Sequence, residues 1–122
     1  MISIIGTVND RLNLLRNSFS ALKPNGWLFL SASGVSDSIN KNYEKLYNAD
    51  YDSTMEHYTY FSRNKQGEIL YITHHFSEME LKSLISDVGF DRIEIKCSRE
   101  ASSRRPDEAA YFLYATCRRP SR

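Results

Sequence analysis

Three histidines are the side chains in this sequence best suited to acid–base chemistry: His57, His74 and His75. An imidazole exchanges a proton near neutral pH, so His57 or His75 could deprotonate an oxygen or nitrogen nucleophile. A structural or solvent-exposed role is the alternative for both. His74 and His75 are adjacent on an expected strand and would point to opposite faces of it, so they would not bind one zinc ion together. We therefore expect no metal site.

Tyrosines are concentrated in the middle of the chain. Residues 34–72 hold six of the eight: Tyr43, Tyr47, Tyr51, Tyr58, Tyr60 and Tyr71. Aromatic rings exclude water and tyrosine adds a polar tip, which suits the wall of a small-molecule site. The alternative is that these rings form a small core of their own.

Cysteine and arginine offer weaker signals. Cys97 and Cys117 are too few and too far apart for a disulfide framework or a thiolate metal cluster, so we expect reduced thiols, although the two could face each other across a final hairpin. That hairpin could also gather arginines into a phosphate-binding patch. The alternative is a solvated loop and tail, because acidic residues dilute the charge. The arginines concerned are Arg99, Arg104, Arg105, Arg118, Arg119 and Arg122.

The composition is that of one small globular domain. The 122 residues include 16 basic and 15 acidic groups, with 41% hydrophobic and 25% charged residues. These values exclude disorder, collagen and a coiled coil. No apolar run is long enough to span a bilayer and no leader is evident at the N-terminus, so we expect a soluble, cytoplasmic protein. The net charge of +1 makes nucleic acid or a membrane an unlikely partner.

The first part of the chain predicts a helix between two strands. Apolar residues recur at spacings of three and four from Leu12 to Leu22, with Asn9 or Asp10 as the cap. Residues 23–26, Lys-Pro-Asn-Gly, end this helix in a turn. Residues 27–33 begin with a continuous apolar run, typical of a strand covered on both faces, so we expect parallel neighbours. Residues 1–5 resemble the end of another strand.

The second part predicts a helix, a hairpin, a helix and two strands. Ser38 could cap a short helix, and residues 57–63 and 68–74 read as a hairpin around the turn at 64–67. Residues 77–80, Ser-Glu-Met-Glu, form a capping box, in which the Glu80 carboxylate reaches back to the Ser77 amide, and the helix that follows ends at Gly89. Residues 93–97 and 109–117 are the last strands.

The order of these elements resembles the C-terminal half of a class I S-adenosylmethionine-dependent methyltransferase. The most specific motif is Ala21-Leu-Lys-Pro-Asn-Gly-Trp-Leu-Phe-Leu30, which is similar to the family's "LKPGG" turn before the fifth strand, with Asn25 in place of the first glycine. The second is Phe76-Ser-Glu-Met-Glu-Leu81 with Gly89-Phe90, similar to the last helix and the start of the sixth strand.

This resemblance spans nearly the whole chain and implies its fold. We expect one α/β domain over residues 1–122, with a Rossmann-like partial sheet of parallel strands plus a C-terminal antiparallel hairpin. Helices should cover both faces, and residues 34–74 should form an insertion that carries a β-hairpin.

The resemblance also implies a function. The chain would be the acceptor side of an enzyme that moves a methyl group from S-adenosylmethionine to a small molecule. The insertion would cover the acceptor, with Tyr43, Tyr47, Tyr58 and Tyr60 as substrate-binding residues. The loop Gly6, Thr7, Val8 and Asn9 would lie near the methionine part of the cofactor; its alternative role is a loop and helix cap.

One departure from the family limits this interpretation. The glycine-rich turn that holds the cofactor after the first strand has no counterpart, since no Gly-x-Gly occurs among the five glycines. Residues 1–5 would be the end of the fourth strand, with an unpaired edge. We therefore expect self-association or a missing N-terminal segment, and inactivity of the isolated chain. The alternative function is a non-catalytic interaction or dimerisation module derived from this fold.

Overall fold

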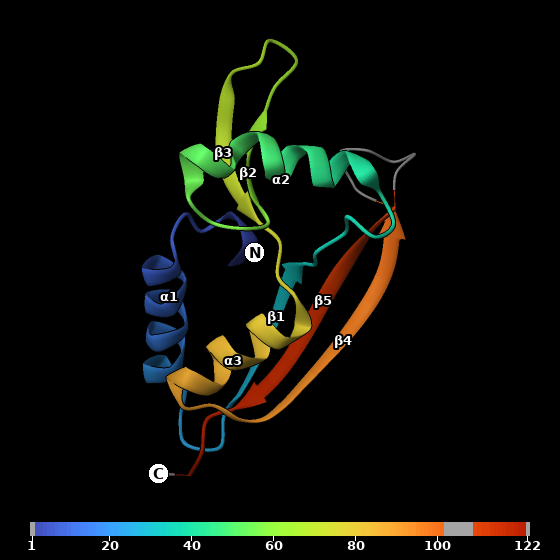
Figure 1. The fold of residues 1–122 in the computed structure, drawn as a ribbon. Coiled ribbons are helices and arrows are strands. Elements are labelled where there is room, and N and C mark those ends of the chain that lie inside the picture. The colour runs from blue at the N-terminus through green and yellow to red at the C-terminus, as the bar shows by residue number, and fades with distance from the viewer. Residues whose placement is uncertain (1, 102–108, 122) are drawn as a thin grey trace.

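The computed structural model describes residues 2–101 and 109–121 and contains two sheets. Figure 1 shows a three-stranded sheet with two helices beside it, and a third helix lying with a two-stranded hairpin at one end. The elements in chain order are η1 (Ile2–Ile4), α1 (Val8–Ala21), β1 (Trp27–Ser33), α2 (Lys41–Thr54), β2 (Thr59–Arg63), β3 (Ile69–His74), α3 (Glu78–Val88), β4 (Asp91–Ala101) and β5 (Ala109–Arg118).

The helix expected near the N-terminus is confirmed as α1, with a different cap. Thr7, and neither Asn9 nor Asp10, caps the helix: its hydroxyl accepts from the Asp10 amide at 3.1 Å. The other end is closed by a side chain from the C-terminal tail, since Arg119 Nη1 donates to the Phe19 carbonyl at 2.9 Å and to the Leu22 carbonyl at 2.5 Å. These contacts add a charged donor to the carbonyls at the end of the helix, of which the Phe19 carbonyl also accepts from the Leu22 amide at 3.3 Å.

The expectation of parallel strands is wrong for the described residues. The main sheet has the order β1-β5-β4 and both pairings are antiparallel; the parallel pairing present is an isolated bridge between Gly34 and Phe76. The apolar run in β1 suggested burial on both faces, but Phe29 is 75% exposed and Trp27 47% exposed. One face of β1 is covered and the other is open, which suits an antiparallel sheet.

Residues 2–4 form a turn of 3-10 helix, so the strand expected there is also wrong. The Ile5 amide donates to the Ile2 carbonyl at 3.1 Å, and the Ser3 hydroxyl accepts from the Ser33 amide at 2.8 Å. The edge of β1 therefore contacts the Ser3 side chain and, at its end, the Phe76 backbone, whose amide donates to the Ser33 carbonyl at 2.8 Å.

Helices α1 and α3 pack on the same face of the main sheet. Leu15 and Ile85 are fully buried there against Leu113 and Ala115 of β5. The opposite face contacts α2 near Ala110 and otherwise exposes side chains such as Phe29. Helices on both faces are therefore confirmed only in part, because α2 covers one end.

The helix and the hairpin expected within residues 34–74 are both present, with shifted boundaries. Helix α2 begins after Asn40, whose side chain accepts from the Asn42 amide at 3.0 Å, so Ser38 is not the cap. The hairpin is confirmed as β2 and β3. Its turn is held by Asn64 Oδ1, which accepts from the Gln66 and Glu68 amides at 3.0 and 2.9 Å.

Half of the expected capping box is present at α3. The Ser77 hydroxyl accepts from the Glu80 amide at 3.1 Å, but the Glu80 carboxylate contacts the His74 ring. The helix ends at Gly89 with φ 115°, as the sequence predicts. A left-handed residue of this kind favours glycine.

The final hairpin, β4 with β5, is confirmed and separates the two cysteines. Cys97 is paired with Leu113, while Cys117 is paired with Leu28, so the thiols do not face each other. Arg118 forms an ion pair with Asp91 at 3.2 Å. Of the arginines considered for a phosphate-binding patch, Arg104, Arg105 and Arg122 lie outside the described residues. No helix in the described part is long and apolar enough to cross a membrane.

Candidate functional site

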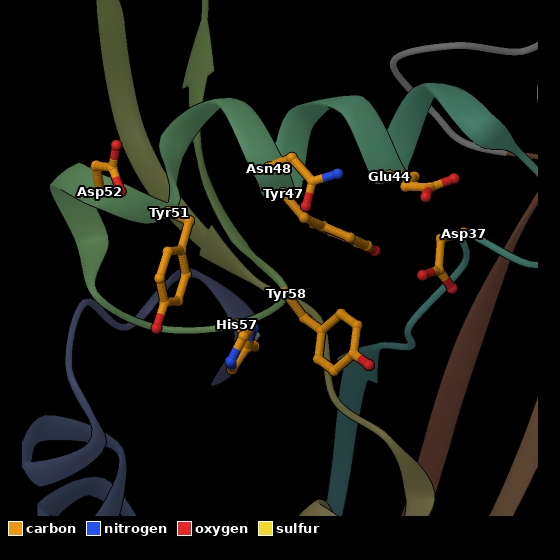
Figure 2. A pocket seen from close by; sticks show the side chains of 8 residues that line it. All are labelled: Asp37, Glu44, Tyr47, Asn48, Tyr51, Asp52, His57 and Tyr58. Carbon is orange, nitrogen blue, oxygen red and sulfur yellow. The ribbon is translucent and has the colours of Figure 1, made fainter.

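One face of α2 and the segments beside it form a pocket of about 370 Å³, which we call the tyrosine pocket. Its helix residues follow the spacing of a single helical face, at positions 44, 47, 48, 51 and 52. The loop after β1 and the loop before β2 complete it. The lining residues, shown in Figure 2, are Asp37, Glu44, Tyr47, Asn48, Tyr51, Asp52, His57 and Tyr58.

A continuous series of rings forms one wall of the tyrosine pocket. Tyr51 stacks on His57 with 4.7 Å between ring centroids, and His57 lies 6.3 Å from Tyr58. Tyr58 then meets Tyr47 edge to face at 5.4 Å. Tyr58 holds a left-handed backbone with φ 61°, an unusual conformation for a bulky residue, which aims its ring at the pocket.

The tyrosine pocket is acidic. Asp37, Glu44 and Asp52 bring three carboxyl groups to the lining, and no lysine or arginine is among the lining residues. Within residues 2–101 and 109–121, none of the three is in an ion pair. Figure 2 places Asp37 and Glu44 together at one end, near the Tyr47 hydroxyl, and Asp52 at the other.

Behind the pocket, His75 is buried among the tyrosines of the insertion. The Tyr47 hydroxyl lies 2.5 Å from His75 Nδ1, and the Tyr60 hydroxyl lies 3.3 Å from Nε2. Tyr43 packs its ring 5.1 Å from the imidazole. Burial raises the pKa of Tyr47, so its hydroxyl stays protonated. The four predicted tyrosines are therefore gathered around this point, but only Tyr47 and Tyr58 line the pocket.

The two histidines proposed as bases thus have different surroundings. His57 is exposed and lines the tyrosine pocket, where it could meet a small molecule. His75 is 3% exposed and has a tyrosine hydroxyl near each ring nitrogen.

His74 lies on the other side of the strand, in a polar network that sequence reasoning missed. Its Nδ1 is 2.9 Å from Glu56 Oε1, and its Nε2 is 2.9 Å from Glu80. Glu56 Oε1 also accepts from Arg11 Nη1 at 2.8 Å and from the Thr59 hydroxyl at 2.7 Å. The network joins α1, α3 and the insertion, so it supports the site structurally.

Burial tends to raise the pKa of Glu56, but the hydrogen bonds from Thr59 and Arg11 and the charges of His74 and Arg11 outweigh it and lower that pKa. Glu56 is therefore ionised and balances the buried Arg11 guanidinium, which is 1% exposed. No pattern marked Arg11 or Glu56 in the sequence. The acidic side of the tyrosine pocket could have been found, because Glu44, Tyr51 and Asp52 share a helical face with Tyr47.

The residues expected to contact the cofactor do not form a complete site for it. The Thr7 hydroxyl is used as the α1 cap, and the Gly6 carbonyl accepts from Arg11 Nη2 at 3.5 Å. Asn9 is exposed on α1. Val8 alone lines a hollow, of about 300 Å³, whose other lining residues are Glu56, His57, Tyr58, His74, Ser77 and Glu80. His57 and Tyr58 therefore lie between this hollow and the tyrosine pocket.

No protein-family model matches the sequence, and no curated protein matches it. Solved structures do. A SAM-dependent methyltransferase from Methanosarcina mazei is similar with a TM-score of 0.89 and 24% identity, over 99% of this chain and 56% of that one. The SAM-dependent methyltransferase SibL gives 0.52 and 18% identity, over 96% and 28% of the two chains. A SAM-dependent methyltransferase from Thermotoga maritima, a possible histamine N-methyltransferase, gives 0.55 and 17%, over 94% and 52%.

These likenesses establish the fold. The chain has the fold of SAM-dependent methyltransferases and spans about half, or less, of the length of the structures it matches. Its extent is consistent with the C-terminal part of that fold.

Proposed function

We propose that this chain is the acceptor side of a methyltransferase that moves a methyl group from S-adenosylmethionine to a small molecule. The observation that carries the proposal is the tyrosine pocket. Asp37 follows the end of β1 by four residues, and in open α/β sheets ligands bind at the carboxyl ends of strands. In this proposal the aromatic rings of residues 34–74 cover the region where such sheets bind ligands.

The chemistry demands positioning more than acid–base groups. S-adenosylmethionine supplies a methyl group on a sulfonium, and an acceptor atom bonds to that carbon as the carbon–sulfur bond breaks, so the positive charge passes to the acceptor. In our proposal Tyr47 and Tyr58 exclude water and orient the acceptor. His57 takes a proton from an acceptor that carries one. His75 holds the two tyrosine hydroxyls in place.

The same proposal assigns the hollow beside Val8 to the cofactor's methionine end, with Gly6 to Asn9 along its rim. The residues there are too few to hold the whole cofactor, and no Gly-x-Gly turn occurs in the 122 residues. We therefore propose that this isolated chain is inactive, and that a second copy or an N-terminal segment completes the cleft. We place the protein in the cytoplasm, in keeping with its two free cysteines.

A second candidate is a non-catalytic interaction or dimerisation module. The observation that favours it is an apolar groove of about 390 Å³ between η1, α1 and β1, which we call the edge groove. Ile4, Leu14 and Phe29 line it and are 47%, 38% and 75% exposed. Exposed apolar surface of this kind marks interaction sites.

Calorimetric titration of the chain with S-adenosylmethionine, with the mass followed by light scattering, separates the two candidates. Micromolar binding by a dimer would support a methyltransferase whose cleft is completed by self-association. A dimer without binding would favour the module. The matched variant is Val8→Trp, whose side chain would fill the proposed cofactor hollow and should weaken binding about tenfold or more. Unchanged binding in that variant would contradict the assignment of the hollow.

A further inference from the structure

We propose that the tyrosine pocket binds an organic ammonium group, so that the methyl acceptor of the proposed reaction is an amine. The assignment of the ligand as a methyl acceptor rests on the proposed function, whereas the assignment of its charge rests on the pocket alone. The sequence alone did not predict an organic cation as the ligand.

The lining of the pocket selects for positive charge. Carboxylates come from two different elements, Asp37 from the loop after β1 and Glu44 and Asp52 from α2, and no lysine or arginine is among the described lining residues. An anionic or phenolate ligand would be repelled here, and a neutral one would gain nothing from the charges. A cation at the end where Asp37 and Glu44 lie together would reduce the repulsion between those two carboxylates.

The aromatic wall selects for an organic cation. Faces of tyrosine attract ammonium groups through the ring quadrupole, most strongly where water is excluded. Tyr47 is 6% exposed and meets Tyr58 edge to face, so the two rings form a rigid corner. Figure 2 shows this corner beside Asp37.

A metal ion fits the same pocket poorly. Glu44 and Asp52 are eight positions apart on α2, which separates them by about 12 Å along the helix axis, too far for both to bind one ion. Among the described residues, no group of three or more metal-binding side chains is arranged to hold a metal. A volume of about 370 Å³ suits a small organic molecule.

Methyl transfer to an amine makes the charge of the pocket useful. The bound ammonium first gives a proton to the His57 imidazole, and the free nitrogen lone pair then forms the new nitrogen–carbon bond as the carbon–sulfur bond of the donor breaks. The sulfonium becomes a thioether, the nitrogen becomes positive, and His57 returns its proton to water. The carboxylates stabilise both the bound ammonium and the charge that develops on nitrogen during transfer, so their contribution is to bind and orient the amine.

The test compares two probes of the same shape, choline and the uncharged 3,3-dimethylbutan-1-ol, by NMR titration of the full chain at low salt. We expect choline to bind at least about tenfold more tightly, with shifts centred on the tyrosine pocket. Asp37→Asn and Glu44→Gln should each weaken choline binding about three- to tenfold without affecting the alcohol. The matched control is Glu94→Gln, which removes the same charge from an exposed position on β4.

Two substitutions of Tyr58 provide a second comparison, one that keeps an aromatic ring and one that removes it. Tyr58→Phe keeps the aromatic face and should bind choline as the unmodified chain does, whereas Tyr58→Leu should lose about threefold or more. Circular dichroism establishes that each variant is folded. The inference would be overturned if the two probes bind with equal affinity. It would also be overturned if neither Asp37→Asn nor Glu44→Gln changes the affinity for choline.

The outcome is separable from that of the proposed function. Selective choline binding by a chain that, even with an added N-terminal half of the fold, neither binds S-adenosylmethionine nor transfers methyl groups would leave the cation site standing and remove the methyltransferase. Methyl transfer to uncharged acceptors by a protein that does not bind choline would support the proposed function and overturn the cation site.

Discussion

At the scale of single residues, the most consequential group is Glu56, because three other side chains, those of Arg11, Thr59 and His74, contact its Oε1. Arg11 is buried and has no other carboxylate within reach among the described residues, and the His74 ring lies between Glu56 and Glu80. Removing the Glu56 charge therefore leaves a buried guanidinium uncompensated. Breaking such a pair costs more than the pair itself contributes.

We expect Glu56→Gln to lower the free energy of unfolding at pH 7 by about 1–3 kcal/mol. The pKa of Glu56 is lowered in the folded chain, so its stabilisation is complete above the unfolded pKa of about 4.5 and is lost as the pH falls through the folded value. The variant should therefore lose less stability than the unmodified chain on acidification. Urea unfolding at pH 7 and pH 4, with Glu94→Gln as control, measures both effects. Parallel acid dependences in the variant and the parent would contradict the ionic role of Glu56.

At the scale of elements, tertiary contacts at the start of α3 replace half of the capping box that the local sequence predicts. The capping box predicts that Ser77 and Glu80 exchange hydrogen bonds, but Glu80 is drawn to His74 across the network. Ser77→Ala should destabilise the chain by about 1 kcal/mol through loss of the cap, and Glu80→Gln should act separately through His74. The double variant should equal the sum of the single ones within about 0.5 kcal/mol. A coupling above 1 kcal/mol in urea unfolding would restore the reciprocal capping box.

Patterns among residues close in sequence predicted the helices and turns well. Features that depend on segments far apart in sequence were predicted wrongly. The turn at residues 64–67, the left-handed end at Gly89 and the helical face of α1 depend on neighbours in sequence, and all three were correct. The direction of the strands beside β1 depends on which distant segment pairs with it. An apolar run predicts that a strand is buried, but not whether its neighbours are parallel or antiparallel to it. Here it also overestimated the burial of β1, because Phe29 is exposed.

The candidate site divides in the same way. The density of tyrosines in the insertion predicted that these rings gather, since aromatic side chains bury large areas wherever a core or pocket forms. Arg11, Glu56 and Asp37 could not be singled out, because each is one charged residue among many and gains its role from a partner far along the chain. Whether the gathered tyrosines bind a substrate stays a prediction.

At the scale of the whole molecule, the edge groove is the surface that we expect to control how the chain assembles. Ser3 and the bridge at Phe76 cover one end of the free edge of β1, while Ile4, Leu14 and Phe29 leave the rest apolar and open. Burying such side chains is worth about 1.5–3 kcal/mol each, enough to favour pairing with a second copy or an N-terminal segment.

We therefore expect the chain to self-associate at micromolar concentration, and Phe29→Lys to raise the dissociation constant about tenfold or more. The control is Met79→Lys, which changes an apolar side chain that is 80% exposed on α3, outside the groove. Sedimentation velocity over a concentration series measures both. A chain that stays monomeric throughout, or two lysine variants with equal effects, would mean that the groove holds no partner of this kind. In that case we expect the free edge of β1 to bind a segment from outside this chain. An added N-terminal half of the fold should then bind the chain, and Phe29→Lys should abolish that binding.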